Sequence, residues 1–169
     1  MEIGKTMTQV AIFMGSKSDL DKLSDGITVL KEFGVEAEVH VCSAHRSPSY
    51  LLKTLRRLES EGLQIVIAAA GGAAHLAGVC AAHTILPVIG IPVDIPPLNG
   101  LDSLLSTVQM PGGIPVATVS IGKAGAKNAA LLAVAILALQ NEALRQKLNK
   151  YRADMAAGIE KQDQELNSK

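Results

Sequence analysis

Aromatic side chains are scarce in this sequence of 169 residues. It contains no tryptophan, two tyrosines and two phenylalanines, so aromatic residues make up 2% of the chain. Surfaces that stack nucleic-acid bases need exposed aromatic rings, and this composition argues against such a surface. The 16 basic and 16 acidic residues balance, so no overall field attracts the protein to nucleic acid or to anionic lipid. We therefore expect neither nucleic acid nor a membrane as a partner.

Cysteine is rare as well. Cys42 and Cys80 are the two cysteines, and neither they nor the four histidines show the spacing of a metal site. A chain of this length can bury an adequate core without disulfides, so the two thiols are expected to be buried and reduced. Near the start of the sequence, no basic-then-apolar segment precedes a cleavage-like site, which predicts a cytoplasmic protein.

A long apolar run is also missing. The longest, residues 129–139, is far shorter than the roughly 20 residues that a membrane-spanning helix needs. A helix over this run would nevertheless be apolar on every face, and such a helix must be covered on all sides. It is either a central core helix or part of an interface between subunits, and we favour the interface.

Strand-like and helix-like segments alternate along the whole sequence. Strands are predicted at residues 9–14, 35–41, 64–70, 88–91 and 116–121. Helices are predicted up to Phe33, from Pro48 (with Ser47 as N-cap) to about Gly62, after His75 to about His83, and at 101–107, 124–139 and 142–156. This alternation predicts a three-layer α/β fold, with helices on both faces of a five-stranded, mostly parallel, flavodoxin/Rossmann-like sheet. We expect a single domain over residues 1–169, with a core at about 9–140 and an extra C-terminal helix and polar tail at 141–169.

Three polar or small-residue segments each follow a predicted strand. They are residues 15–19 (G-S-K-S-D), 43–47 (S-A-H-R-S) and 71–75 (G-G-A-A-H). Ligands of parallel α/β sheets bind beyond the carboxyl ends of the strands. We therefore expect the three segments to meet at one edge of the sheet and to form a binding site there.

The first segment has the chemistry of a phosphate site. Ser16 and Ser18 offer hydroxyl groups beside the free N–H groups at a helix start, which favour anions, and Asp19 can accept hydrogen bonds from a sugar diol. Together they indicate a ribose phosphate. The alternative is that Ser18 or Asp19 only caps the helix, as such residues often do. Neither G-x-G-x-x-G nor G-x-x-x-x-G-K-[ST] is present, so neither a dinucleotide nor ATP is indicated.

The other two segments supply a cation and two imidazoles. Arg46, with Ser43 beside it, is a candidate second clamp for the phosphate, because a guanidinium binds anions with two hydrogen bonds. His45 is a candidate general acid and base, because an imidazole exchanges protons near neutral pH. His75 could orient a carboxylate. The alternatives are a surface arginine and two histidines without a chemical role.

These segments resemble signatures of the PurE family of purine biosynthesis. The matching stretches are residues 14–19, 43–48, 70–76, 100–104, 109–111 and 122–126, and the likeness runs from about residue 10 to 148. The family divides into N5-carboxyaminoimidazole ribonucleotide (N5-CAIR) mutases and carboxylases that use carbon dioxide directly. Arg46 after the loop histidine and His75 after Gly-Gly-Ala-Ala are similar to the mutases. Residues 94–97 (D-I-P-P) depart from the more polar loop that is usual in the family.

The resemblance implies an isomerase of IMP biosynthesis that converts N5-CAIR to 4-carboxy-5-aminoimidazole ribonucleotide (CAIR). Carbon dioxide would be released and recaptured in a dry pocket near residues 71–76, without any metal, nucleotide or redox cofactor, in a homo-octamer. His45 would be the catalytic proton carrier. The implied substrate-binding residues are Ser16, Ser18, Asp19, Ser43, Arg46, Ala70, Gly71, His75 and Leu76. The alternatives are a direct carboxylase that uses carbon dioxide and a non-catalytic ribonucleotide-binding module.

Overall fold

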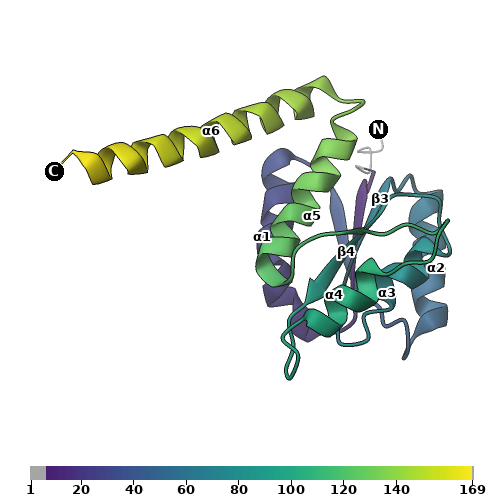
Figure 1. Ribbon diagram of the computed structural model, residues 1–169. Helices are drawn as coiled ribbons and strands as arrows, with labels where there is room; N and C mark the ends of the chain where they lie inside the picture. Colours follow the sequence, from purple (N-terminus) through teal and green to yellow (C-terminus); the bar gives the residue numbers. More distant parts are fainter. Residues whose placement is uncertain (1–6, 169) are drawn as a thin grey trace, which may run out of the picture. The chain divides into compact units, whose positions relative to one another are not determined.

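The computed structural model describes residues 7–168, and these contain a five-stranded sheet in which every strand pairing is parallel (Figure 1). The strand order is β2-β1-β3-β4-β5. The strands are β1 (Val10–Met14), β2 (Ala37–Val41), β3 (Ile65–Gly71), β4 (Val88–Val93) and β5 (Ala117–Thr118). Of the described helices, η1 (Lys17–Asp19), α1 (Leu20–Phe33), α2 (Pro48–Ser60), α3 (Leu76–Ala81), α4 (Leu101–Val108) and α5 (Gly122–Leu137) follow the strands in alternation, and α6 (Glu142–Asn167) comes last. The predicted α/β fold is confirmed.

Alternate side chains of the central strands face opposite layers of helices. Ala11 and Phe13 of β1 pack with the buried leucines of α2 and with α3. Ile12 of β1 faces the other way, toward Leu23 and Leu30 of α1 and the first turns of α5. Because both faces of β1 and β3 are covered, these strands are apolar at nearly every position, as parallel strands between two helix layers must be.

Helix ends explain how the chain turns toward the next strand. Gly34 has a left-handed backbone with φ 75°, and its N–H and that of Val35 donate to the carbonyls of Lys31 and Leu30. This is a Schellman motif, which ends α1 as the sequence predicts. Pro48 opens α2, also as predicted. Ser47 is the N-cap residue of α2, as predicted, but its side chain makes no capping bond to the helix, because its Oγ accepts from the Ser43 N–H (3.0 Å).

The ends of three strands differ from the prediction by two residues or more, and those of the other two strands by a single residue. The second strand begins at Ala37 rather than at residue 35, because Val35 N–H is used in closing α1. The fourth strand continues through Pro92 to Val93. The fifth has only two residues instead of six. Pro92 has no N–H to offer a neighbouring strand, so the β4–β5 ladder stops near Gly90, whose carbonyl accepts from the Val119 N–H.

The described chain divides into two compact units, one up to Ala133 and one from Val134 onward. The second unit contains the end of α5 and the whole of α6, which begins at the N-cap Asn141. The prediction that this helix ends near residue 156 is wrong, since it extends to Asn167. The ion pair Lys161–Glu165, four residues apart, supports the part expected to be a charged tail, and Lys150–Asp154 supports the turns before it. Within residues 7–168, no helix is long and apolar enough to cross a membrane.

Candidate functional site

A cavity of about 280 Å³ opens at the carboxyl edge of the sheet. It lies where the chain order reverses, since β1 is followed by β2 on one side and β3 on the other, and such a switch point is the usual ligand site of open α/β sheets. The residues that line it lie at the end of β3 or follow β1, β2, β3 and β4; they are Gly15, Ser16, Asp19, Ser43, Ala44, His45, Arg46, Ala70, Gly71, Ala73, His75, Leu76 and Ile95. All predicted site residues except Ser18 are in this lining.

The turn after β1 is organised around Ser16. Its Oγ accepts hydrogen bonds from the N–H of Ser18 (3.3 Å) and from the Ser18 hydroxyl (2.8 Å), so Ser16 caps the short helix η1. Ser18 therefore supports the cavity wall through Ser16. In the described chain the Asp19 side chain makes no capping bond to α1, which argues against the alternative that Asp19 is only a cap.

Asp19 lies half-buried at the cavity. Burial raises the pKa of its carboxyl group, while a hydrogen bond from the Ser16 backbone and the charge of Lys22 oppose this rise. A carboxylate that has lost part of its water gains from new hydrogen-bond donors. It is suited to accept hydrogen bonds from the hydroxyl groups of a ligand.

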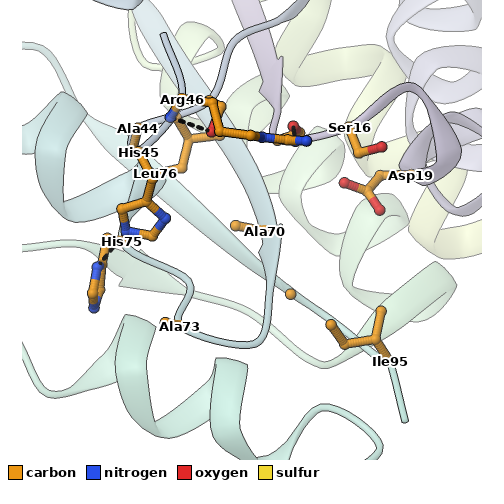
Figure 2. A pocket seen from close by; sticks show the side chains of 13 residues that line it. Ser16, Asp19, Ala44, His45, Arg46, Ala70, Ala73, His75, Leu76 and Ile95 are labelled. Atoms are coloured by element: carbon orange, nitrogen blue, oxygen red, sulfur yellow. Dashed lines mark hydrogen bonds between the residues drawn. The ribbon is translucent and has the colours of Figure 1, made fainter. Parts of the chain in front are cut away.

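Arg46 reaches from the turn after β2 to the end of β1. Its Nη2 donates to the Gly15 carbonyl (2.8 Å), and its backbone N–H donates to Ser43 Oγ (3.0 Å). These bonds hold the guanidinium across the rim of the cavity, from the side of His45 toward Ser16 and Asp19 (Figure 2). A guanidinium fixed in this way can present its other N–H groups to an anion.

Arg46 also borders a second hollow, of about 390 Å³. Its lining is rich in hydroxyl groups and cations and consists of Gly15, Ser16, Lys17, Val41, Ser43, Arg46 and Ser47. Sequence reasoning did not assign a role to Lys17, although it lies in the phosphate-like segment. Two cations and three serine hydroxyls around one hollow suit a phosphate group.

His45 and His75 form a pair at the other side of the cavity. Nε2 of His45 lies 2.7 Å from Nδ1 of His75, and the rings meet edge to face, with centroids 4.8 Å apart and planes at 85°. At this distance the two nitrogens share a hydrogen bond, in which one ring donates its N–H and the other ring accepts. The sequence placed both histidines at the same edge of the sheet, and the structure adds that they are in direct contact. The pair can pass a proton to and from a ligand in the cavity.

Sequence reasoning missed two apolar lining residues, Ala44 and Ile95, and did not single out Ala73 within the pocket predicted near residues 71–76. Ile95 follows β4, whose carboxyl end lies at the same edge, and this was the signal that could have found it. Among residues 7–168, no group of three or more histidines, cysteines or carboxylates is arranged for a metal ion.

The two cysteines lie in the core. Cys42 and Cys80 are fully buried, and burial raises the pKa of both thiols, that of Cys80 to about 12. A thiol is a nucleophile only after it loses its proton, so neither side chain is suited to covalent catalysis. The prediction of two buried, free thiols is confirmed.

A parallel α/β fold with an anion-binding rim and a histidine pair at its switch point defines a protein that acts on a small anionic molecule. The family model described as AIR carboxylase matches residues 9–158, and the chain belongs to this family, the PurE family. It is 51% identical over 149 residues to the N5-carboxyaminoimidazole ribonucleotide mutase of Saccharolobus solfataricus, covering 88% of this chain and 93% of that protein. It is 55% identical over 149 residues to the same-named protein of Pyrococcus abyssi, covering 88% and 84%.

A crystal structure of Treponema denticola PurE has the same fold. The TM-score is 0.86 at 29% sequence identity, and the alignment covers 94% of this chain and 98% of that one. The family resemblance drawn from the sequence motifs is therefore confirmed.

Proposed function

We propose that this protein is an N5-CAIR mutase of purine biosynthesis, an isomerase that moves a carboxyl group from nitrogen to carbon of an aminoimidazole ribonucleotide. Its family membership and its roughly 50% identity to mutases support this function. The observation that carries the proposal is the histidine pair at 2.7 Å in the same cavity as Arg46 and Asp19. One side of that cavity can move a proton while the other holds a sugar phosphate.

The substrate fits the two hollows by its chemistry. The phosphate lies among Lys17, Arg46 and the nearby serine hydroxyls, because cations and O–H donors stabilise its charge. The ribose hydroxyls donate to Asp19. The heterocycle then extends into the cavity lined by Ala70, Gly71 and Leu76, beside His45.

The transfer proceeds in two balanced steps. The bond between the exocyclic nitrogen and the carboxyl carbon breaks, the electron pair stays on nitrogen, and protonated His45 gives the nitrogen a proton. Carbon dioxide remains in the cavity. Carbon C4 of the imidazole attacks it to form the new C–C bond, and His45 takes the C4 proton as the ring regains aromaticity. No proton or electron is gained or lost overall, so the reaction needs no redox cofactor. Holding carbon dioxide beside its acceptor replaces a slow encounter from solution.

We also propose a homo-oligomer, an octamer, in the cytoplasm. The outward face of α4 supports an interface between subunits. Leu101, Leu105 and Val108 recur along it at helical spacing and are 53%, 52% and 47% exposed. A contiguous apolar stripe of this kind is typical of a surface that another chain covers. Sedimentation of the purified protein tests the number of subunits.

The function is tested by giving the purified protein N5-CAIR without ATP or bicarbonate. A mutase forms CAIR under these conditions. A direct carboxylase forms CAIR only from the decarboxylated ribonucleotide and added carbon dioxide, and that result would reject our proposal. A non-catalytic binding module would bind the ribonucleotide and give no product in either assay.

A further inference from the structure

We infer that Ile95, held in place by Lys22 and Asp94, is the wall that keeps the released carbon dioxide in the cavity until C4 captures it. Neither the proton chemistry of the histidine pair nor the phosphate contacts explain what prevents the gas from leaving. The inference rests on the proposed function and adds to it a group that controls the fate of the intermediate.

Ile95 packs against the turn after β3 at the lip of the cavity. If Gly71 carried a Cβ, this atom would lie 3.0–3.3 Å from three carbons of the Ile95 side chain, and a Cβ on Gly72 would lie 3.6 Å from Cδ1. The side chain therefore sits directly over this glycine turn. Glycine at position 71 permits this close approach.

The surroundings of Ile95 are apolar on the carbon dioxide side. Ala70, Ala73 and Leu76 line the same cavity and offer no side-chain hydrogen-bond donor. Carbon dioxide has no net dipole and is held by such a surface, whereas water gains nothing there. Ile95, which follows β4, completes this apolar lining.

Asp94, the residue before Ile95, is held in place from two sides. The Nζ of Lys22 on α1 lies 2.9 Å from Asp94 Oδ1 and also donates to the Asp94 backbone carbonyl. This bond lowers the pKa of the Asp94 carboxyl group. On the other side, a Cβ on Gly122 would lie 2.9 Å from the same Oδ1, so the half-exposed carboxylate lies against both α1 and the start of α5.

The chain after Ile95 is also held. The Asn99 N–H donates to the Ile95 carbonyl (3.0 Å), and Ser103 Oγ lies 2.9 Å from the carbonyl oxygens of Val93 and Gly100. Gly100 has φ 91°, and a Cβ there would lie 2.6 Å from Ile121 Cγ2. Ile95 is therefore positioned by fixed backbone on both sides.

The fraction of carbon dioxide that escapes measures how well Ile95 retains it. After the C–N bond breaks, carbon dioxide either joins C4 to give CAIR or escapes and leaves the free aminoimidazole ribonucleotide. A weaker wall increases the yield of the free aminoimidazole ribonucleotide at the expense of CAIR. It also admits dissolved carbon dioxide, which then appears in the product.

The experiment supplies N5-CAIR to the full-length protein in ¹³C-bicarbonate buffer and counts the free amine and the ¹³C in CAIR, relative to a sample without protein. The wild type is expected to give mostly unlabelled CAIR and little amine. Ile95→Ser should raise both the amine-to-CAIR ratio and the label several-fold. Ile95→Val, which keeps an apolar branched side chain, should stay near the wild type.

Lys22 and Asp94 act as positioning residues, and their variants test the anchor. Lys22→Met and Asp94→Asn should raise the amine-to-CAIR ratio in the same direction, by less than Ile95→Ser, and Lys22→Arg should restore part of the retention. The matched control is Lys31→Met, an exposed lysine on the same helix, which should leave the ratio unchanged.

The outcomes separate this inference from the proposed function. No CAIR from the wild type would overturn both. Normal turnover by the wild type with an unchanged ratio in Ile95→Ser would overturn only the role of the wall. If Ile95→Ser does not fold, Ile95→Ala removes the same packing without adding a hydroxyl, and a wild-type ratio in that variant would equally refute the inference.

Discussion

Replacing His45 by asparagine removes the only proton carrier that we assign to the reaction and keeps a polar side chain at the cavity. General acid and base catalysis by one positioned side chain contributes about 10²- to 10⁴-fold to a rate. We therefore expect kcat of His45→Asn to fall by about this factor. The KM should change little, because the proposed phosphate and ribose contacts come from Arg46, Lys17 and Asp19 on the opposite side of the site.

The fold should tolerate this change. His45 and His75 are both exposed, so water can replace the hydrogen bond at 2.7 Å when one imidazole is removed. Surface substitutions of this kind change the free energy of unfolding by about 0.5 kcal/mol or less. The Tm of His45→Asn should therefore match that of the parent.

The assay is conversion of N5-CAIR to CAIR under single-turnover and steady-state conditions, with thermal unfolding measured on the same samples. His75→Asn serves as the comparison, because it removes the partner ring and leaves His45 in place; a smaller loss of kcat is expected. A fall of less than about tenfold in His45→Asn would contradict its role as the proton carrier. A rise of KM by about the factor expected for kcat, with no change in kcat itself, would show that the His45 ring only binds the substrate.

Four further predictions concern binding and stability. Arg46→Ala should raise KM roughly 10- to 100-fold with kcat nearly kept, because a hydrogen bond to a charged group is worth about 1.5–3 kcal/mol; steady-state kinetics check this. Asp19→Asn should weaken ribonucleotide binding and yet raise the free energy of unfolding at pH 7. Burial raises the folded-state pKa of Asp19, so ionisation of this carboxyl group lowers the free energy of unfolding as pH rises above the ordinary pKa of 3.8. At pH 3, where the group is protonated in both states, denaturation should show no stability gain of Asp19→Asn over the parent. Gly125→Ala should destabilise by about 1–3 kcal/mol or more, since its Cβ would lie 1.7 Å from the Ser120 carbonyl oxygen. Gly158→Ala on α6 meets nothing within 4 Å and should stabilise by about 0.5–1 kcal/mol, so equal Tm shifts in the two glycine variants would refute the packing argument.

Local patterns in the sequence determined the elements and the edge at which the site lies. The alternation of apolar strands and helices predicts a parallel sheet, and a parallel sheet brings the segments after Met14, Val41 and Gly71 to one edge whatever the strand order. Helix ends with a local cause, such as Gly34 and Pro48, were also predicted correctly. The motif likeness then identified the family.

Tertiary structure alone decided the contacts within the site. The contact between His45 and His75 joins residues 30 positions apart, and it depends on β2 and β3 both flanking β1, an order that periodicity does not encode. The wall formed by Ile95 depends likewise on β4 lying beside β3. The structure also decided which neighbour the Ser47 hydroxyl takes, since it accepts from the Ser43 N–H four residues earlier and makes no side-chain bond to α2. Residue patterns report which face of a segment is buried, whereas the partner on that face is chosen by the packing of the whole chain.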